Sequence, residues 1–187
     1  ANTVYLAGDS FTAYAIITTS NTYINRASEG WFNWFDSFLG CPFSVMGLTA
    51  AGGQTCRQMI DSQFPTIFAL TTKPKYVCFT AGLNDIYAEL VTAAEAYLRI
   101  VEAVQALMAR GITPIWGTIF PKAYDSVATP TAVQCNDMLR LFAQQNNCGI
   151  FIDFAAIMND PASANNEGRT LASYYHDSTT HPNNLFA

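Results

Sequence analysis

Basic residues are scarce in this sequence, and charge of either sign is low. Lysine and arginine together number 9 of 187 residues against 14 aspartates and glutamates, which gives a formal net charge of −5 at pH 7. Nucleic acids require a basic face on the protein that binds them, and anionic membranes attract basic segments. The composition therefore argues against either partner.

Long apolar runs are also missing. No stretch approaches the roughly 18 uninterrupted apolar residues of a membrane span, and no basic segment followed by an apolar one marks a secretory signal. The chain begins at Ala1, almost directly in an expected strand, without an initiator methionine. We therefore expect a piece processed or cut from something longer, such as a multidomain or oligomeric assembly, and an extracellular location is favoured over a cytoplasmic one.

Metal-binding patterns are absent as well. Two histidines are present, and the five cysteines form neither a CxxC pair nor a Cys/His metal spacing: Cys41, Cys56, Cys78, Cys135 and Cys148. We expect no metal and no cofactor. Cys78 lies in an apolar run and is expected in the core. A disulfide between Cys41 and Cys56 is the one pairing left open.

The chain does contain a regular alternation of short apolar strands and amphipathic helices. Strands are expected at Thr3–Ala7, Phe43–Leu48, Lys75–Thr80, Thr113–Thr118 and Gly149–Asp153. Each is an apolar run with little polar alternation, which is typical of strands covered on both faces. Together they predict βαβ units and one α/β domain over residues 1–187, a three-layer α/β/α sandwich around a mostly parallel five-stranded sheet.

Three helical patterns lie between the strands, and each predicts an inward face. SEGWFNWFDSFLG begins at a capping Ser28 and stops at Gly40, with Trp31, Trp34 and Phe38 expected in the core. The second pattern, VTAAEAYLRIVEAVQALMARG, predicts a helix whose inward face carries Ala94, Leu98, Val101, Val104 or Gln105, and Met108. TAVQCNDMLRLFAQQNN is expected to turn inward Val133, Met138, Leu141 and Phe142.

Chemically useful residues gather where these strands end. Ligands of open parallel sheets bind beyond the carboxyl ends of the strands. Four stretches of the sequence lie at or near such positions: GDS at 8–10, TAAGGQT at 49–55, AGLNDI at 81–86 and, near the C-terminus, YYHDSTTHPN at 174–183. They supply a serine, a glycine pair, an amide and a His/Asp pair. Acyl transfer needs this set, because a serine hydroxyl requires an oriented imidazole as base and the oxyanion requires preorganised donors.

The ordered blocks GDS, a glycine turn, GLND and a late HP preceded by Asp resemble the SGNH (GDSL) hydrolase family, from Gly8 to Pro182. The resemblance implies a flavodoxin-like fold with Ser10 as nucleophile and His181 as general base. It also implies an oxyanion hole built from the N–H of Ser10, the N–H of Gly53 and the amide of Asn84. Gly52 is the alternative to Gly53, because the doubled glycine leaves the register open by one residue.

The family usually places its aspartate three residues before the histidine, where this chain has Ser178. Asp177 lies four residues before His181, and we expect it to complete the triad. A backbone carbonyl orienting His181 in a Ser–His dyad is the alternative. The reserve candidates are His176 as base and Asp153 or Asp160 as acid. Asp9 and Asp85 are expected to brace the loops.

These residues predict a serine esterase acting on a small-molecule or glycan ester, most directly one that removes O-acetyl groups from a carbohydrate. The loops are rich in Asn, Thr and aromatic residues, which suit sugars, and no long apolar segment could cover a lipid chain. A short-chain lipase, arylesterase or thioesterase of the same fold is the nearest alternative. A non-catalytic carbohydrate-binding or adhesion domain is the alternative from another class, since the chain stops at Ala187, where a final helix would begin. A nucleotide-binding module is disfavoured because no phosphate-cradling glycine loop follows the first strand.

Overall fold

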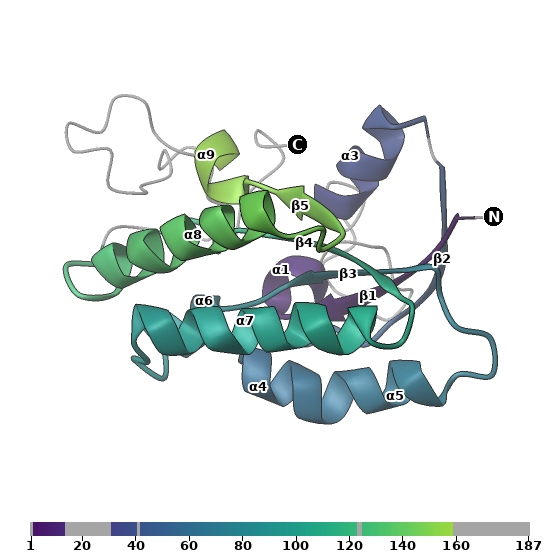
Figure 1. Cartoon of the computed structure of the whole chain (residues 1–187), viewed down its shortest axis with the longest axis horizontal. Helices are drawn as coiled ribbons and strands as arrows, with labels where there is room; N and C mark the ends of the chain where they lie inside the picture. Colours follow the sequence, from purple (N-terminus) through teal and green to yellow (C-terminus); the bar gives the residue numbers. More distant parts are fainter. Residues whose placement is uncertain (1, 14–30, 41, 123–124, 159–187) are drawn as a thin grey trace.

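A computed structural model describes residues 2–13, 31–40, 42–122 and 125–158 of the chain (Figure 1). Five strands form a single parallel sheet in the order β2-β1-β3-β4-β5. Their bounds are Asn2–Gly8 for β1, Phe43–Leu48 for β2, Tyr76–Thr80 for β3, Thr113–Gly117 for β4 and Ile150–Ile152 for β5. Every predicted strand is therefore present, and the predicted fold class is confirmed.

Helices connect the strands and lie on both faces of the sheet. Their bounds are Ser10–Ala13 for α1, Trp31–Phe38 for α3, Cys56–Gln58 for α4, Phe64–Ala69 for α5, Leu83–Tyr87 for α6, Ala93–Met108 for α7, Ala128–Gln145 for α8 and Phe154–Met158 for α9. A π-helical turn, η1 (Met59–Gln63), joins α4 to α5. Within the described ranges, no helix combines the length and apolar character needed to cross a membrane.

The alternation of side chains along the strands divides the core into two layers. One face of the sheet, which includes Tyr5, Val77 and Phe79, packs against α4, η1, α5, α7 and α8, and the labels α4, α5 and α7 lie below the strands in Figure 1. The other face carries Val4, Leu6, Cys78 and Ile115 and is covered by Phe32 of α3. Cys78 is a buried free thiol, as expected. Cys56 is also free, and Cys41 lies outside the described residues.

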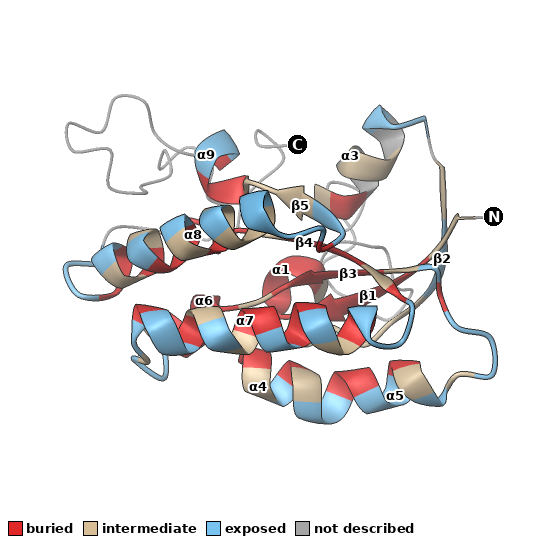
Figure 2. Ribbon diagram, in the orientation of Figure 1, coloured by how far each residue is buried: buried red, intermediate tan, exposed pale blue. Residues whose placement is uncertain are grey.

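The predicted inward faces of α7 and α8 are partly wrong. Leu98 and Leu141 are 62% and 52% exposed, and Met108 and Ala94 are exposed as well. Val101 and Val104 are buried as predicted, but the other buried positions of α7 are Ala93, Ala96, Ile100, Ala103 and Leu107 (Figure 2). Small side chains at the contact let a helix approach its neighbours closely, whereas a prediction from hydrophobicity alone favours the largest apolar residues.

The aromatic residues of α3 also divide differently from the prediction. Trp31 is half-buried and packs with Phe154 at a ring-centroid distance of 5.1 Å. Phe38, expected in the core, is 83% exposed, because it lies in the last turn of α3, beyond the part that covers the sheet. The Trp34 side chain lies outside the described residues.

Candidate active site

Ser10 stands at the carboxyl end of β1, between β2 and β3. The strand ends at Gly8, whose φ of +116° turns the chain, and α1 begins at Ser10 itself. Asp9 closes the turn by accepting a hydrogen bond from the Phe11 N–H (3.0 Å, N to Oδ1) and by its carbonyl accepting from Ala13 (2.9 Å). Ser10 is 7% exposed, so the serine lies in a largely buried turn.

Asp9 attaches this turn to the neighbouring strand β3. The Thr80 hydroxyl donates to Asp9 Oδ1 at 2.8 Å, and the Asp9 N–H donates to the Thr80 carbonyl at 3.2 Å. Burial raises the pKa of Asp9 from 3.8 to about 7, with a small addition from the charge of Asp85, although the hydrogen bonds from Thr80 and Phe11 act to lower it. Asp9 braces the serine turn, as the sequence predicted.

The raised pKa of Asp9 makes the free energy of unfolding pH-dependent. The folded state holds this proton more tightly than the unfolded chain, so the contribution is fully present below about pH 4 and is lost as the pH rises to about 7. Three pKa units correspond to about 4 kcal/mol. Asp9→Asn keeps an acceptor oxygen but cannot ionise, so we expect its stability relative to the native chain to rise between pH 4.5 and pH 8 in urea unfolding.

Asp125→Asn supplies a control that should stay flat over this range. Backbone N–H groups of Ala128 and Val127 hold the pKa of Asp125 below its ordinary value of 3.8, so its contribution is lost only as the pH falls below that value. A stability difference between Asp9→Asn and the native chain that stays flat across this pH range would contradict the assignment of a raised pKa to Asp9.

The glycine pair follows β2 in a loop that continues alongside β1. The Thr49 N–H donates to the Leu6 carbonyl at 2.9 Å, and the Ala51 N–H donates to the Gly8 carbonyl at 3.0 Å. Gly53 has φ +76°, is exposed and has open space around its Cβ position, whereas Gly52 does not have a positive φ. The left-handed conformation therefore requires glycine at 53, and a ligand can approach its backbone.

Asn84 connects this loop to the end of β3. It lies in the first turn of α6, which begins after Gly82, and its Nδ2 donates to the Gln54 carbonyl at 2.9 Å. The amide carries two N–H groups, and this bond uses one of them. Ser10, the Gly53 loop and Asn84 thus lie at the carboxyl ends of three adjacent strands.

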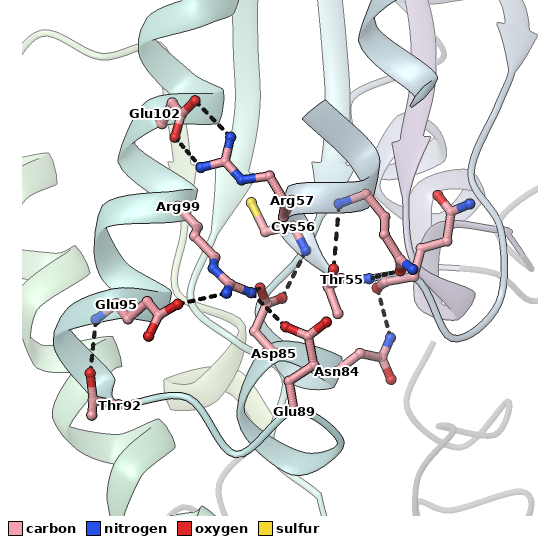
Figure 3. A network of polar contacts seen from close by, with 12 residues as sticks. Thr55, Cys56, Arg57, Asn84, Asp85, Glu89, Thr92, Glu95, Arg99 and Glu102 are labelled. Carbon is pink, nitrogen blue, oxygen red and sulfur yellow. Dashed lines mark hydrogen bonds and ion pairs between the residues drawn. The ribbon is translucent and has the colours of Figure 1, made fainter. Parts of the chain in front are cut away.

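Asp85, the residue after Asn84, anchors the same region through its contacts with Cys56 and Arg99 (Figure 3). Its side chain is fully buried and accepts from the Cys56 N–H and from Arg99 Nη1, both at 2.8 Å. Arg99 also pairs with Glu89 and Glu95, and its hydrogen bonds to Glu89 and Asp85 raise its pKa. Asp85 therefore fixes the start of α4 to α6 and α7, and braces the loops as predicted. The sequence did not indicate Arg99, because a helical arginine is usually a surface residue.

Aromatic rings pack directly behind the serine turn. Phe11 stacks on Phe120 with centroids 4.4 Å apart, and Phe120 stacks on Phe154 at 4.3 Å. These residues come from α1, from the loop after β4 and from α9. The stack supports the residue that follows Ser10.

A cavity of about 400 Å³ lies beyond Phe120, between α8 and α9. Its lining residues do not include Ser10, Gly53 or Asn84. Polar groups in its wall are paired within the protein: Arg140 donates twice to Asp153, and the Asn136 amide bonds the backbone of Ile119. Among the described residues, the wall of this cavity therefore offers no unpaired polar cluster.

Asp153, a reserve candidate for the triad acid, already has partners. Burial acts against its ionisation, but Arg140, the Ala156 N–H and the Thr118 hydroxyl hold its pKa below the ordinary value. Its role is to join β5 to α8. His181, Asp177, His176 and Asp160 lie outside the described residues, so the acid and base of the triad stay predictions.

Comparison with known proteins places this arrangement among related folds. Residues 6–185 match the model of the GDSL-like lipase/acylhydrolase family. No curated protein is a significant match to the sequence.

Solved structures of the same fold include a protein of the G-D-S-L lipolytic family from Desulfitobacterium hafniense, with a TM-score of 0.71 and 20% identity over 100% of this chain and 93% of that chain. The acetyl xylan esterase AlAXEase matches with a TM-score of 0.66 and 18% identity, over 98% and 92% of the two chains. The esterase EstA from Pseudoalteromonas, in a structure inhibited by monoethylphosphonate, matches with a TM-score of 0.66 and 15% identity, over 99% of this chain and 90% of that chain.

Proposed function

Because this chain belongs to the GDSL-like lipase/acylhydrolase family, whose chemistry is ester hydrolysis, we propose that Ser10 is the nucleophile of a serine esterase. One observation carries the proposal: a buried serine at the end of β1 lies beside two loops joined by the bond from Asn84 Nδ2 to the Gln54 carbonyl. That bond brings the backbone next to Gly53 and a side-chain amide to the same edge of the sheet.

The proposed reaction begins when Ser10 Oγ attacks the ester carbonyl carbon and His181 takes the hydroxyl proton. Asp177 orients the imidazole and stabilises its charged form. The negative charge on the carbonyl oxygen is stabilised by the N–H groups of Ser10 and Gly53 and by the Asn84 amide, and each such donor lowers the barrier by about 3 kcal/mol. Collapse transfers the His181 proton to the leaving alcohol, and water then hydrolyses the acyl-enzyme.

For the substrate we propose an O-acetyl group on a carbohydrate. The related fold of AlAXEase, an acetyl xylan esterase, supports this choice. The loop residues rich in Asn, Thr and aromatic side chains support it further. A short-chain lipase, arylesterase or thioesterase is the alternative within the same fold.

The substrate class is tested by measuring acetate release from acetylated glycans beside kcat/KM for p-nitrophenyl esters of rising chain length. We expect acetate release and a kcat/KM that is highest for the acetyl ester and falls with each added methylene pair. A kcat/KM that rises toward octanoate, with no acetate released from any glycan, would assign the protein to lipids or other acyl esters instead.

A fluorophosphonate probe separates the enzyme from a binding domain. EstA was inhibited by a phosphonate, and we expect a probe of that class to label Ser10 here. Absence of labelling, together with measurable glycan binding, would favour a non-catalytic carbohydrate-binding or adhesion domain.

A further inference from the structure

Gln63 makes an unusual contact with the strand that precedes the nucleophile. It is the last residue of the π-helical turn η1 and is 3% exposed. The Gly8 N–H donates to Gln63 Oε1 at 2.7 Å, and Gln63 Nε2 donates back to the Gly8 carbonyl at 2.9 Å. One buried side-chain amide therefore binds both backbone polar groups of the residue two positions before Ser10.

The same amide also binds the loop that carries Gly53. Gln63 Nε2 donates its second N–H to Oε1 of Gln54, the residue after Gly53. The Gln54 carbonyl in turn accepts from Asn84 Nδ2. A continuous chain of contacts thus runs from Gly8 through Gln63 and Gln54 to Asn84, and it touches every loop that carries a proposed oxyanion donor.

The place of this contact explains why a side chain is needed there. β2 ends at Leu48, before it reaches the position opposite Gly8. The Gly8 N–H therefore donates to the Gln63 side chain rather than to a carbonyl of β2. A buried backbone N–H without a partner would be costly. The carboxamide acts as one more peptide unit of the sheet at the point where β2 has ended. Its source is a π-helical turn, which is rare and recurs at functional sites.

We propose that Gln63 is a positioning residue for the oxyanion hole. It holds the Gly8–Ser10 turn and the Gly53–Gln54 turn at a fixed separation, so that the donors converge on one oxygen. Displacing such donors by a fraction of an ångström weakens the transition state more than the bound substrate, because the oxyanion forms only during reaction. This role rests on the proposed esterase function.

The test compares two buried amides that make the same kind of contact. Asn136 in α8 accepts from the Ile119 N–H at 2.7 Å and donates to the Ile119 carbonyl at 3.2 Å, at the end of β4, where no oxyanion donor is proposed. We expect Gln63→Met to lower kcat about 10- to 100-fold with KM changed less than about threefold. Asn136→Leu should lower the thermal midpoint comparably but leave kcat within about twofold of the native enzyme.

Gln63→Glu adds a pH readout that a purely structural role would not move. Burial raises the pKa of a carboxyl group placed here, and its protonated form keeps an acceptor for Gly8 and one O–H donor. Ionisation removes that donor and introduces a charge. We therefore expect kcat relative to the native enzyme to fall steadily from about pH 5.5 to about pH 8.5. This variant also tests the proposal if Gln63→Met does not fold.

The outcomes are distinct. A folded Gln63→Met with native kcat, equal losses of kcat in Gln63→Met and Asn136→Leu, or a flat relative profile for Gln63→Glu would each overturn the positioning role while leaving the esterase intact. A native protein that neither hydrolyses esters nor reacts with the fluorophosphonate would overturn the proposed function, and this role with it.

Discussion

Ser10→Ala is expected to lower kcat for ester hydrolysis by about 10⁴-fold or more, because removing a serine nucleophile leaves only the contribution of the oxyanion hole and substrate binding. The serine occupies a buried first position of α1, where alanine fits and forms a helix well. Folding should therefore be retained, and KM should change little. Steady-state kinetics on p-nitrophenyl acetate measure the effect.

Ser126→Ala is the matched control, since Ser126 is an exposed serine in a turn before α8. It should keep native kcat and should still react with the fluorophosphonate. If Ser10→Ala retained native activity after its circular dichroism had shown a native fold, the nucleophile would have to be sought elsewhere.

Gly8→Ala is expected to abolish the folded state or to lower the free energy of unfolding by about 4 kcal/mol or more, a large share of the 5–15 kcal/mol typical of a domain. A Cβ at this position would lie 2.3 Å from the Thr80 carbonyl oxygen and 2.9 Å from the Thr80 nitrogen. Both are backbone atoms of β3, so a side-chain rotation cannot relieve the overlap. The φ of +116° adds strain for any L side chain.

Gly111→Ala separates the cost of the steric overlap from the cost of the left-handed backbone conformation. Gly111 also has a positive φ, +71°, but open space surrounds its Cβ position. We expect it to cost about 1–2 kcal/mol, the penalty of the left-handed conformation alone. Urea unfolding of the two variants measures the difference, and equal losses would mean that the contact of Gly8 with Thr80 relaxes easily.

The strands and the serine turn could be predicted because their signals are local. Phe43–Leu48 and its counterparts are short, mostly apolar runs, and Gly8, Ser10 and Asn84 each stand at or shortly after the end of such a run. Parallel topology then brings those ends to one edge. The positive φ of Gly53 accounts for a glycine at that position, and the choice of Gly53 over Gly52 as an oxyanion donor stays a prediction.

Features that depend on packing between distant segments could not be predicted in this way. Leu98 looked like a core residue, but Ala96 and Ala103 make the close contacts of α7. One feature of Gln63 does indicate a buried contact: its amide stands beside Phe64 in an inward-facing helical segment. A polar group buried there must have a hydrogen-bond partner. That its partner is Gly8, 55 residues away, follows only from the fold.

The position of β1 in the middle of the sheet has a consequence for how the chain reaches this state. β1 pairs with β2 and with β3, and these partners lie some 40 and 70 residues later in the sequence. Such pairings cost loop-closure entropy before the contacts that they form can stabilise the chain, and this slows folding. Ser10, Gly53 and Asn84 come together only through those pairings, so the proposed oxyanion donors assemble only once these slow long-range pairings have formed.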